Sequence, residues 1–338
     1  MANAVATSGL HTYNGKEVTT ELFWKPQEGS DNIFENYKVM QVADKSNLYI
    51  PGNLTKIIKE YSGCGFSASG ATTITDRIII TEKVKVNLEQ CEDAWDDTIF
   101  EESLKQGVDI DDLRGTVVQR IILTKLLEGM RNDIARMQWF NRDGHSAADY
   151  AHYDGWLERA FDTSANLGYI LDMSGNTSIE TSGADDSLVT DGTLTAFRLL
   201  WENQSKVLRA IPRKDKRIFV TASIMDNYLT SLEDTQNERG HGNLEDGTPV
   251  VLFRGVPVVE VPGWDTHLDD TDNPQATKIG NNLIVMTMPD NLIVGSDITN
   301  PDNEIKTWYS EDNETLRFKA KLKIGAQILH PEFMSLMY

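Results

Sequence analysis

The sequence has little cysteine, no long apolar run and few basic residues for its length. Only Cys64 and Cys91 occur in 338 residues, and neither has the CxxC spacing of a metal site nearby. No stretch approaches the roughly 18 apolar residues that a membrane span requires. Residues 1–7 lack the basic start and long apolar middle of a secretory signal. We therefore expect a soluble chain, made in a cytoplasm, whose cysteines are free thiols.

Acidic residues outnumber basic ones by 52 to 32, which gives a formal net charge of −20. Proteins that read nucleic-acid sequence need clustered Lys and Arg to neutralise phosphates. The charge therefore argues against that class of protein. It agrees with simple solubility and also with a container that does not adhere to enclosed DNA, and the composition leaves both interpretations open.

The length indicates more than one lobe, because single cores stop growing near 250–300 residues, roughly. Residues 1–50 alternate polar and aromatic positions without a steady period and contain several Gly and Pro breakers. We expect an extended arm there, with little core of its own, that is ordered by something else.

The strongest helical signal covers residues 112–141 and predicts a structural spine of roughly 40 Å. Its apolar residues recur every three or four positions, at Val118, Ile122, Leu126, Met130, Ile134 and Met137. Shorter helices are predicted at 54–61, 92–106, 153–161, 194–208 and 223–232, the last with Ser223 as its cap.

Strand signals fall in two parts of the chain. β-Branched residues at 71–75 and 77–88 predict a projecting hairpin over roughly 63–90. Further strands are predicted at 217–222 and within 247–262, 282–297 and 316–329, separated by polar loops at 172–192 and 234–247. Two lobes joined by at least two crossings account for this order.

Three groups of residues are candidates for chemistry. The glycines at 63, 65 and 70 fit neither GxGxxG nor the Walker pattern, so they favour a hinge over a phosphate loop. His145, Asp149, His152 and Asp154 form the only cluster of His with carboxylates, and such side chains can bind zinc or iron. Their spacing matches neither HExxH nor a facial triad, and polar residues are expected after a helix end.

The acidic loop from Asp265 to Asn273 is a weaker candidate, for calcium. It contains Asp269, Asp270 and Asp272 but lacks the glycine and the distal glutamate of an EF-hand loop. No GxSxG motif and no Cys with an evident His partner is present. We therefore predict no catalytic, cofactor-binding or metal-ligating residue, no cofactor and no enzyme activity.

Several short motifs occur in a set order along nearly the whole chain. After the glycine-punctuated hairpin and the long helix come Asn-Arg-Asp-Gly at 141–144, Asp-Gly-Trp-Leu at 154–157, Phe-Val-Thr-Ala-Ser at 219–223, Gly-Val-Pro-Val-Val-Glu-Val-Pro at 255–262, and Ala-Lys-Leu-Lys-Ile-Gly-Ala-Gln-Ile at 320–328 before His-Pro-Glu-Phe at 330–333. This order resembles that of the major capsid proteins of tailed double-stranded-DNA bacteriophages.

The resemblance implies an α+β chain with the HK-ninety-seven-like capsid fold. It implies an N-terminal arm at 1–50 and an extended β-hairpin loop at 63–90. It also implies a peripheral domain with a long spine helix, made of 91–185 and 301–338 together with 51–62, and an axial domain at 186–300. Loops near 234–247 and 265–280 would face the centres of capsomers.

The same resemblance implies a structural role. Copies of the chain would self-assemble into hexamers and pentamers that form an icosahedral shell around packaged double-stranded DNA. The implied partners are other copies, a separate scaffolding protein, a portal at one vertex and a decoration protein. The chain would belong to the virion and be assembled in the cytoplasm of a host bacterium. No residue is assigned to covalent cross-linking.

Two alternatives stay open from the sequence. An encapsulin-type nanocompartment shell would share the fold and hold enzymes in place of a genome. A metal-dependent enzyme would use His145, Asp149 and His152 as ligands.

Overall fold

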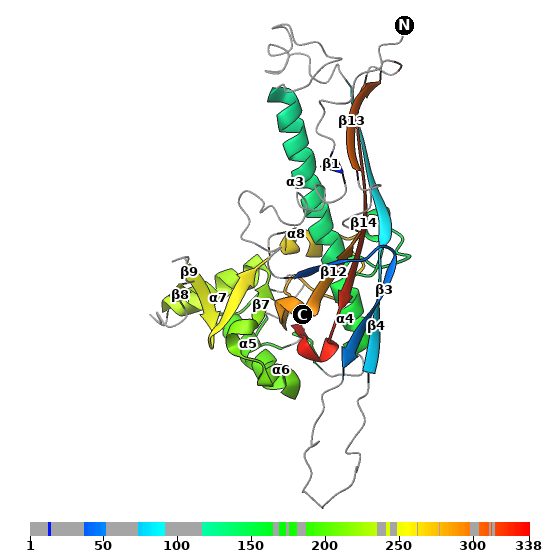
Figure 1. Cartoon of the computed structure of the whole chain (residues 1–338). Coiled ribbons are helices and arrows are strands. Elements are labelled where there is room, and N and C mark those ends of the chain that lie inside the picture. Colours follow the sequence, from blue (N-terminus) through cyan, green and yellow to red (C-terminus); the bar gives the residue numbers. More distant parts are fainter. Residues whose placement is uncertain are drawn as a thin grey trace, which may run out of the picture.

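The computed structural model describes residues 13–14, 37–51, 74–91, 117–164, 169–173, 176–180, 187–234, 241–243, 249–261, 263–276, 278–297, 304–310, 312 and 315–338. Figure 1 shows the long helix α3 (Val117–Phe140) running beside a tall strip of strands, with a second sheet and its helices to one side. Among the described helices, none is both long and apolar enough to cross a membrane.

The first sheet is built around one long strand, β14 (Thr315–Ile328). On one side β14 pairs with the antiparallel strand β5 (Glu82–Cys91). On its other side it pairs first with β13 (Glu304–Ser310) and then with β12 (Leu292–Ser296), both antiparallel. The sheet is completed by β1 (Tyr13–Asn14) next to β13 and by β2 (Lys38–Gln41), which is parallel to β12.

The second sheet has seven strands, and helices pack on it. Its order is β6 (Ile170–Leu171), β15 (Ser335–Met337), β11 (Ile284–Thr287), β7 (Arg217–Val220), β10 (Val256–Glu260), β9 (Pro249–Phe253) and β8 (His241–Asn243). Its core includes residues of α5 (Gly192–Asn203), α6 (Lys206–Ala210) and α7 (Ala222–Asp234). β9 and β10 join through Arg254 and Gly255, whose positive φ angles of 51° and 82° are typical of a tight hairpin turn.

The first core lies between α3 and β14, and the predicted stripe of the spine helix is confirmed where its side chains are described. Leu126, Met130, Ile134 and Met137 are all buried in this core. The side chains of Val118 and Ile122, and residues 112–116, lie outside the described residues. The core also contains an aromatic group in which Trp139 contacts the rings of Trp156 and Trp264, each with a centroid distance of 4.8 Å.

Shorter elements close this core. They are η5 (Ala148–Tyr150), α4 (Trp156–Ser164), α8 (Trp264–Leu268), η8 (Pro289–Asn291) and η9 (Pro331–Phe333), while η6 (Arg213–Asp215) precedes β7. The segment 265–280 contains much of α8 and packs against the spine region within the subunit; its position at a capsomer centre stays a prediction. Trp264 meets Phe140 of α3, and Tyr150 donates a 2.8 Å hydrogen bond to Asp270.

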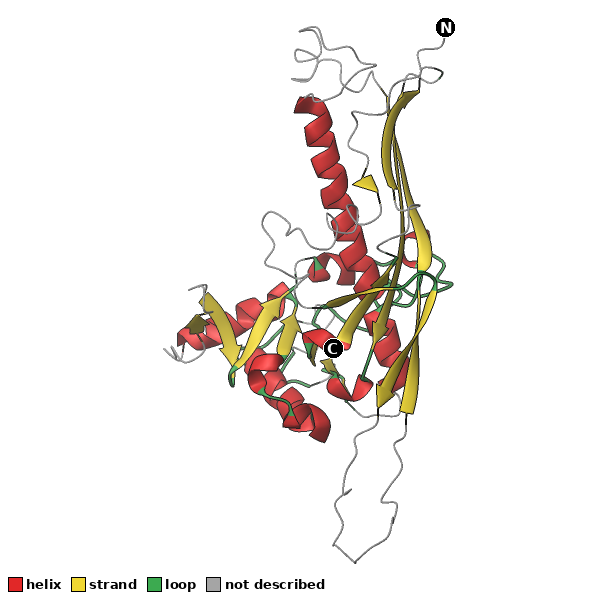
Figure 2. Cartoon of the chain, in the orientation of Figure 1, coloured by secondary structure: helices red, strands yellow, loops and turns green. Residues whose placement is uncertain are grey.

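The strand pairing of the extended loop differs from the expected hairpin within 63–90. β4 (Ile74–Ile80) pairs with β3 (Lys45–Pro51), forming a two-stranded ribbon, whereas β5 leaves this ribbon and pairs with β14. The sequence signal failed because 74–91 is one nearly continuous β-branched run, so its partners could not be told from local pattern alone. Figure 2 shows the ribbon extending below the strip.

Part of the expected arm is also integral to the fold. Within residues 1–50, β2 enters the first sheet and Tyr37, Val42 and Leu48 are buried. The prediction of little core there was wrong for 37–50. Three scattered apolar residues are enough to bury this segment, because β2 pairs with β12 at the edge of the first sheet. Apart from β1, residues 1–36 lie outside the described part of the chain.

Two helix predictions need correction. The helix expected over 194–208 is two helices. α5 ends at Asn203 with Gln204 as its C-cap, and Ser205 caps α6 because its Oγ accepts a 2.8 Å hydrogen bond from the Leu208 N–H. α7 begins at Ala222, one residue before the predicted cap Ser223, and the Ala222 N–H donates to the Asp265 carboxylate at 3.0 Å. The predicted helices at 54–61 and 92–106, the glycines at 63, 65 and 70, and Cys64 lie outside the described residues.

The strand pairing crosses the predicted domain ranges in two places. β12 falls within 186–300, yet it pairs with β14 and β2 in the first sheet. β6 and β15 fall within the ranges assigned to the peripheral domain, yet they belong to the sheet of β7. The two sheets therefore exchange strands across these ranges, and the domain boundaries themselves stay a prediction.

Candidate functional site at the base of the extended loop

The base of the β3–β4 ribbon is held against the first sheet by a group of hydrogen bonds and ion pairs. The turn Val42–Ala43–Asp44 joins β2 to β3, and Thr81 joins β4 to β5. The Thr81 N–H donates to the Asp44 carbonyl at 2.9 Å, and the Val42 N–H donates to the Ser296 carbonyl at 3.0 Å. The ribbon is therefore attached at both of its strands.

Two glycines make room for the ribbon on the sheet. Gly295 of β12 and Gly325 of β14 lie directly opposite each other. A Cβ on Gly325 would overlap the backbone carbonyl of Ile80, and one on Gly295 would lie 2.8 Å from the Ile79 Cδ1. Glycine in a strand often marks such a close backbone approach, and this glycine slot is what lets β4 lie directly on β14.

Ile79 fills the space above the glycine slot. Its side chain is fully buried, and it forms a small separate core with Val42, Leu48 and Ile293. Burying an isoleucine is worth about 1.5–3 kcal/mol. Ile78, its neighbour, accepts a 2.6 Å hydrogen bond at its carbonyl from the Gln327 side chain. The base of the ribbon thus has apolar and polar anchors of its own.

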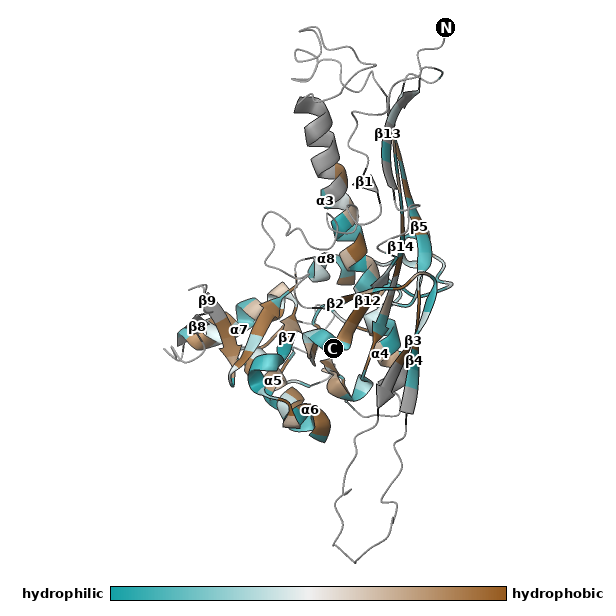
Figure 3. Cartoon of the chain, viewed as in Figure 1, coloured by the Kyte–Doolittle hydropathy of each residue, from teal (hydrophilic) through white to brown (hydrophobic). Residues whose placement is uncertain are grey.

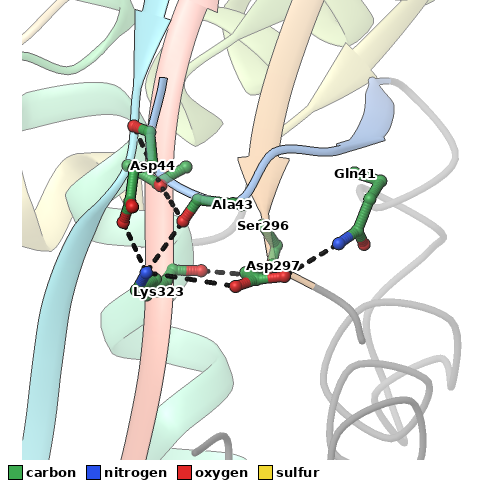
Figure 4. Close-up of polar contacts among 7 residues, drawn as sticks. Gln41, Ala43, Asp44, Ser296, Asp297 and Lys323 are labelled. Atoms are coloured by element: carbon green, nitrogen blue, oxygen red, sulfur yellow. Dashed lines mark hydrogen bonds and ion pairs between the residues drawn. The ribbon is translucent and has the colours of Figure 1, made fainter. Parts of the chain in front are cut away.

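Lys323 is the centre of the polar contacts, which Figure 4 shows together. Its Nζ donates 2.9 Å and 2.5 Å hydrogen bonds to the Ala43 carbonyl and to Asp44 Oδ1, and it lies 4.0 Å from Asp297 Oδ2. Asp297 also accepts a 2.8 Å hydrogen bond from Gln41. Because Lys323 and Asp297 are both buried, each needs the other's charge to offset its loss of hydration.

Lys323 changes the pKa of Asp44, although the Asp44 side chain is exposed. The hydrogen bond from Lys323, followed by the charge of that ammonium group, lowers the pKa of the Asp44 carboxyl below its ordinary value. The carboxylate is therefore the form that the folded state favours. The group we call the Lys323 clasp, made of Lys323, Asp44, Asp297 and Gln41, fixes the turn that leads into the ribbon.

The residues that the sequence offered as metal ligands do not come together. His145 Nδ1 accepts a 3.2 Å hydrogen bond from the Ala147 N–H. Asp154 accepts one of 3.0 Å from the Asp143 N–H, while Asp149 and His152 line a groove between α3 and β5. Across the described part of the chain, no group of three or more His, Cys, Asp or Glu side chains could hold a metal ion.

The acidic loop from Asp265 to Asn273 is used within the fold. Asp265 accepts from the first N–H of α7, and Asp270 accepts both from Tyr150 and, at 3.0 Å, from the Asp272 N–H. These contacts lower the pKa of Asp270. The hydrogen bond to that carboxylate and burial raise the pKa of Tyr150, burial being the larger cause. The loop therefore connects α7, α8 and the end of the spine.

Sequence reasoning missed the glycine slot and the Lys323 clasp. One signal was present, because Gly295 and Gly325 each interrupt an otherwise apolar strand pattern, which indicates a bulge or close backbone approach. No comparable signal marks Lys323, since it alternates with apolar residues just as Lys319 and Lys321 do. Its burial depends on residues 41–44, nearly the whole chain length away.

No protein-family model matches the chain, and no curated protein matches it. Solved structures, in contrast, match almost its full length. The capsid of cyanophage P-SCSP1u matches with a TM-score of 0.52 at 14% identity, covering 98% of this chain and 97% of that one. The procapsid of satellite phage P4, which includes the size-determination protein Sid, matches with 0.53 at 12% identity, covering 92% and 95%.

A third match is the encapsulin SrpI complex of Synechococcus elongatus PCC 7942, with a TM-score of 0.51 at 8% identity, covering 93% of this chain and 89% of that one. The chain therefore has the fold of the tailed-phage capsid structures, which encapsulin shares. The predicted α+β class with the HK-ninety-seven-like fold is confirmed. At these identities the likeness shows the fold.

Proposed function

We propose that the chain is a major capsid protein of a tailed double-stranded-DNA bacteriophage. Copies self-assemble into hexamers and pentamers that close an icosahedral shell around packaged DNA. The observation that carries this proposal is the likeness to two phage shell structures over at least 92% of the chain and of each matched chain. A match of that extent leaves little of the chain to form a domain with a separate activity.

The exposed features of the ribbon support assembly. Ile78 and Ile80 of β4 are 37% and 49% exposed, and Leu88 of β5 is 50% exposed. A two-stranded ribbon is marginally stable alone, and exposed isoleucines on one of its strands favour a protein contact. A neighbouring subunit that covers this ribbon would remove both problems.

The remaining parts of the proposal follow from this role. The partners are other copies of the chain, a separate scaffolding protein, a portal at one vertex and a decoration protein. The chain is a virion component that assembles in the cytoplasm of a host bacterium and encloses DNA without reading its sequence. The proposal assigns it no catalytic residue, metal or cofactor.

The test is assembly of the purified protein. We expect hexamers, pentamers or closed shells of uniform curvature in mass photometry and negative-stain images, with or without the scaffolding protein. A chain that stays monomeric at high concentration under both conditions would contradict the proposal.

An encapsulin-type shell is the second candidate, and the SrpI match is the observation that favours it. The two candidates differ in cargo. Shells isolated from the native source should contain double-stranded DNA if the chain is a phage capsid protein, and a folded enzyme if it is an encapsulin. Neighbouring genes for a portal and scaffold, or for a cargo enzyme, give the same distinction.

A further inference from the structure

One face of the strip formed by β5, β14 and β13 is lined with lysines. Alternation along a strand sends successive side chains to opposite faces. Val84 and Leu322, which lie opposite each other, point into the core with α3. The other face carries the group that we call the lysine strip, made of Lys83, Lys85, Lys306, Lys319, Lys321 and Lys323. Figure 3 colours much of the described β5 as hydrophilic.

The register places lysines directly against lysines. Lys85 lies opposite Lys321, Lys83 opposite Lys323, and Lys306 opposite Lys319. Side chains in such positions have Cβ atoms about 4.5–5.5 Å apart, and like charges there destabilise the pairing. Such pairs work against the stability of the isolated subunit where no carboxylate lies near them; Lys323 has Asp44 and Asp297, and Glu304 of β13 lies opposite Lys321.

The described part of the chain supplies few anions to this strip. Lys323 is held by Asp44 and Asp297 at one end, and Arg317 is paired with Glu89 at 3.0 Å toward the other. Between them, Lys85, Lys319 and Lys321 have no carboxylate within ion-pair distance among the described residues. Lys85 and Lys321 are exposed and Lys319 is half-buried, so the strip is accessible to an outside anion.

Two observations favour carboxylates of a protein over phosphates of DNA. The chain has a formal net charge of −20. The electrostatic field of one copy therefore repels DNA and attracts the lysine strip of another copy. The strip also begins next to an exposed apolar side chain, because Ile80, which is 49% exposed, is separated from β5 by Thr81 alone. Apolar groups beside charged ones are typical of protein interfaces.

The sequence contains a stretch with the complementary charge. Residues 92–112 hold nine carboxylates and one lysine, the highest acidic density next to any described element of this sheet. Eight of the nine occur in adjacent pairs, at 92–93, 96–97, 101–102 and 111–112. This density of negative charge is complementary to a row of lysines.

We propose that the lysine strip is a subunit interface that binds the acidic stretch 92–112 of a second copy of this chain. The inference rests on the proposed shell function and deepens it, because it names the electrostatic contact through which neighbouring subunits join. In the assembly the neighbour's carboxylates approach Lys85, Lys319 and Lys321 and offset their mutual repulsion. The strip therefore favours the assembled state over the monomer.

The test uses two charge-reversed full-length chains. The first carries Lys85→Glu, Lys319→Glu and Lys321→Glu. The second carries Asp96→Lys, Asp97→Lys, Glu101→Lys and Glu102→Lys. We expect each alone to give at least tenfold less assembled protein than the parent, and an equimolar mixture of the two to return to within twofold of it. The Tm of the unassembled first variant should equal or exceed that of the parent.

The alternatives give different results. If the acidic stretch binds the strip of its own chain, the mixture fails and a single chain carrying both sets of changes assembles, which overturns the proposal. If the strip binds DNA, the first variant assembles like the parent and its subunit loses affinity for double-stranded DNA, which also overturns it. A large fall in Tm for the first variant means that the lysines stabilise the fold itself, which overturns the proposal as well. A parent that never assembles overturns the proposed function together with this inference.

Discussion

Replacing Gly325 by alanine should detach the base of the β3–β4 ribbon from the sheet. The added Cβ would overlap the carbonyl oxygen of Ile80, which belongs to backbone and cannot rotate away. β4 must therefore move off β14 at this point. Gly295 faces the same slot, but its nearest atoms are the Ile79 Cδ1 and the Thr81 Cγ2, at 2.8 Å and 3.1 Å. Those methyl groups can shift, so Gly295→Ala is the matched control.

The loss of stability in Gly325→Ala can be estimated from the contacts that β4 loses when it moves off β14. Exposing Ile79, which is fully buried, costs about 1.5–3 kcal/mol. Losing the hydrogen bond from Gln327 to the Ile78 carbonyl costs about 1 kcal/mol. Alanine restricts the unfolded chain and returns about 0.4–1 kcal/mol. We therefore expect Gly325→Ala to lose about 2–3 kcal/mol, and Gly295→Ala to lose less than about 1 kcal/mol.

Two measurements on the unassembled subunit check this prediction. Urea unfolding gives the change in free energy for both variants. Amide hydrogen exchange locates it, because β3 and β4 should lose protection in Gly325→Ala while the core strands β7 and β11 keep theirs. Equal losses in the two variants, or unchanged protection of β3 and β4, would refute the idea that the glycine slot seats the ribbon.

Three further predictions concern the core and the clasp. Ile134→Ala should cost about 2–5 kcal/mol in urea unfolding because its side chain is buried between α3 and β14, whereas exposed Asp133→Ala should cost less than about 0.5 kcal/mol; similar values for both would contradict the assignment of the stripe. Lys323→Met should cost about 2 kcal/mol or more, because it leaves the buried Asp297 carboxylate without its cation, and an unchanged midpoint would count against the clasp. The pKa of Asp44 is lowered in the folded state, so its contribution is present above the unfolded value of about 3.9 and is lost as the pH falls through the lower folded value. The difference in Tm between the parent and Asp44→Asn should therefore be constant from about pH 7 to 5 and shrink toward pH 3, and a difference that grows in acid would refute this sign.

The sequence predicted those parts of the fold that local periodicity specifies. The spine stripe through Met130 and Ile134 repeats at helical spacing, and the strand from 316 to 329 alternates regularly, so both were placed within a few residues. The partner of β4 could not be predicted in this way. β-Branched residues at 74–91 say that strands form but not which strands they meet, since pairing depends on contacts between distant segments.

The candidate site shows the same limit in its individual residues. Lys323, Lys321 and Lys319 are equivalent in the sequence pattern, yet the first is buried and Lys321 is exposed. The difference arises because the turn 42–44 covers only one end of β14, where Gly325 leaves room for β4. No property of β14 alone identifies which of its lysines becomes structural.

β14 therefore connects the stable core to the surfaces that we propose for assembly. The side chains on one of its faces, Phe318, Ala320, Leu322, Ile324, Ala326 and Ile328, all belong to the core that contains α3. Along the other face, the residues make different contacts. Lys319 and Lys321 face outward, and Lys323 donates to the carbonyl in the turn 42–44. Gly325 leaves room for β4, and Gln327 donates to the Ile78 carbonyl. Because a strand with one face fixed in a core cannot slip by one residue without exposing that face, the core also fixes the positions of the clasp and the lysine strip. A neighbouring subunit that contacts the ribbon or the strip would then bind to a surface whose geometry is set by the core of this one.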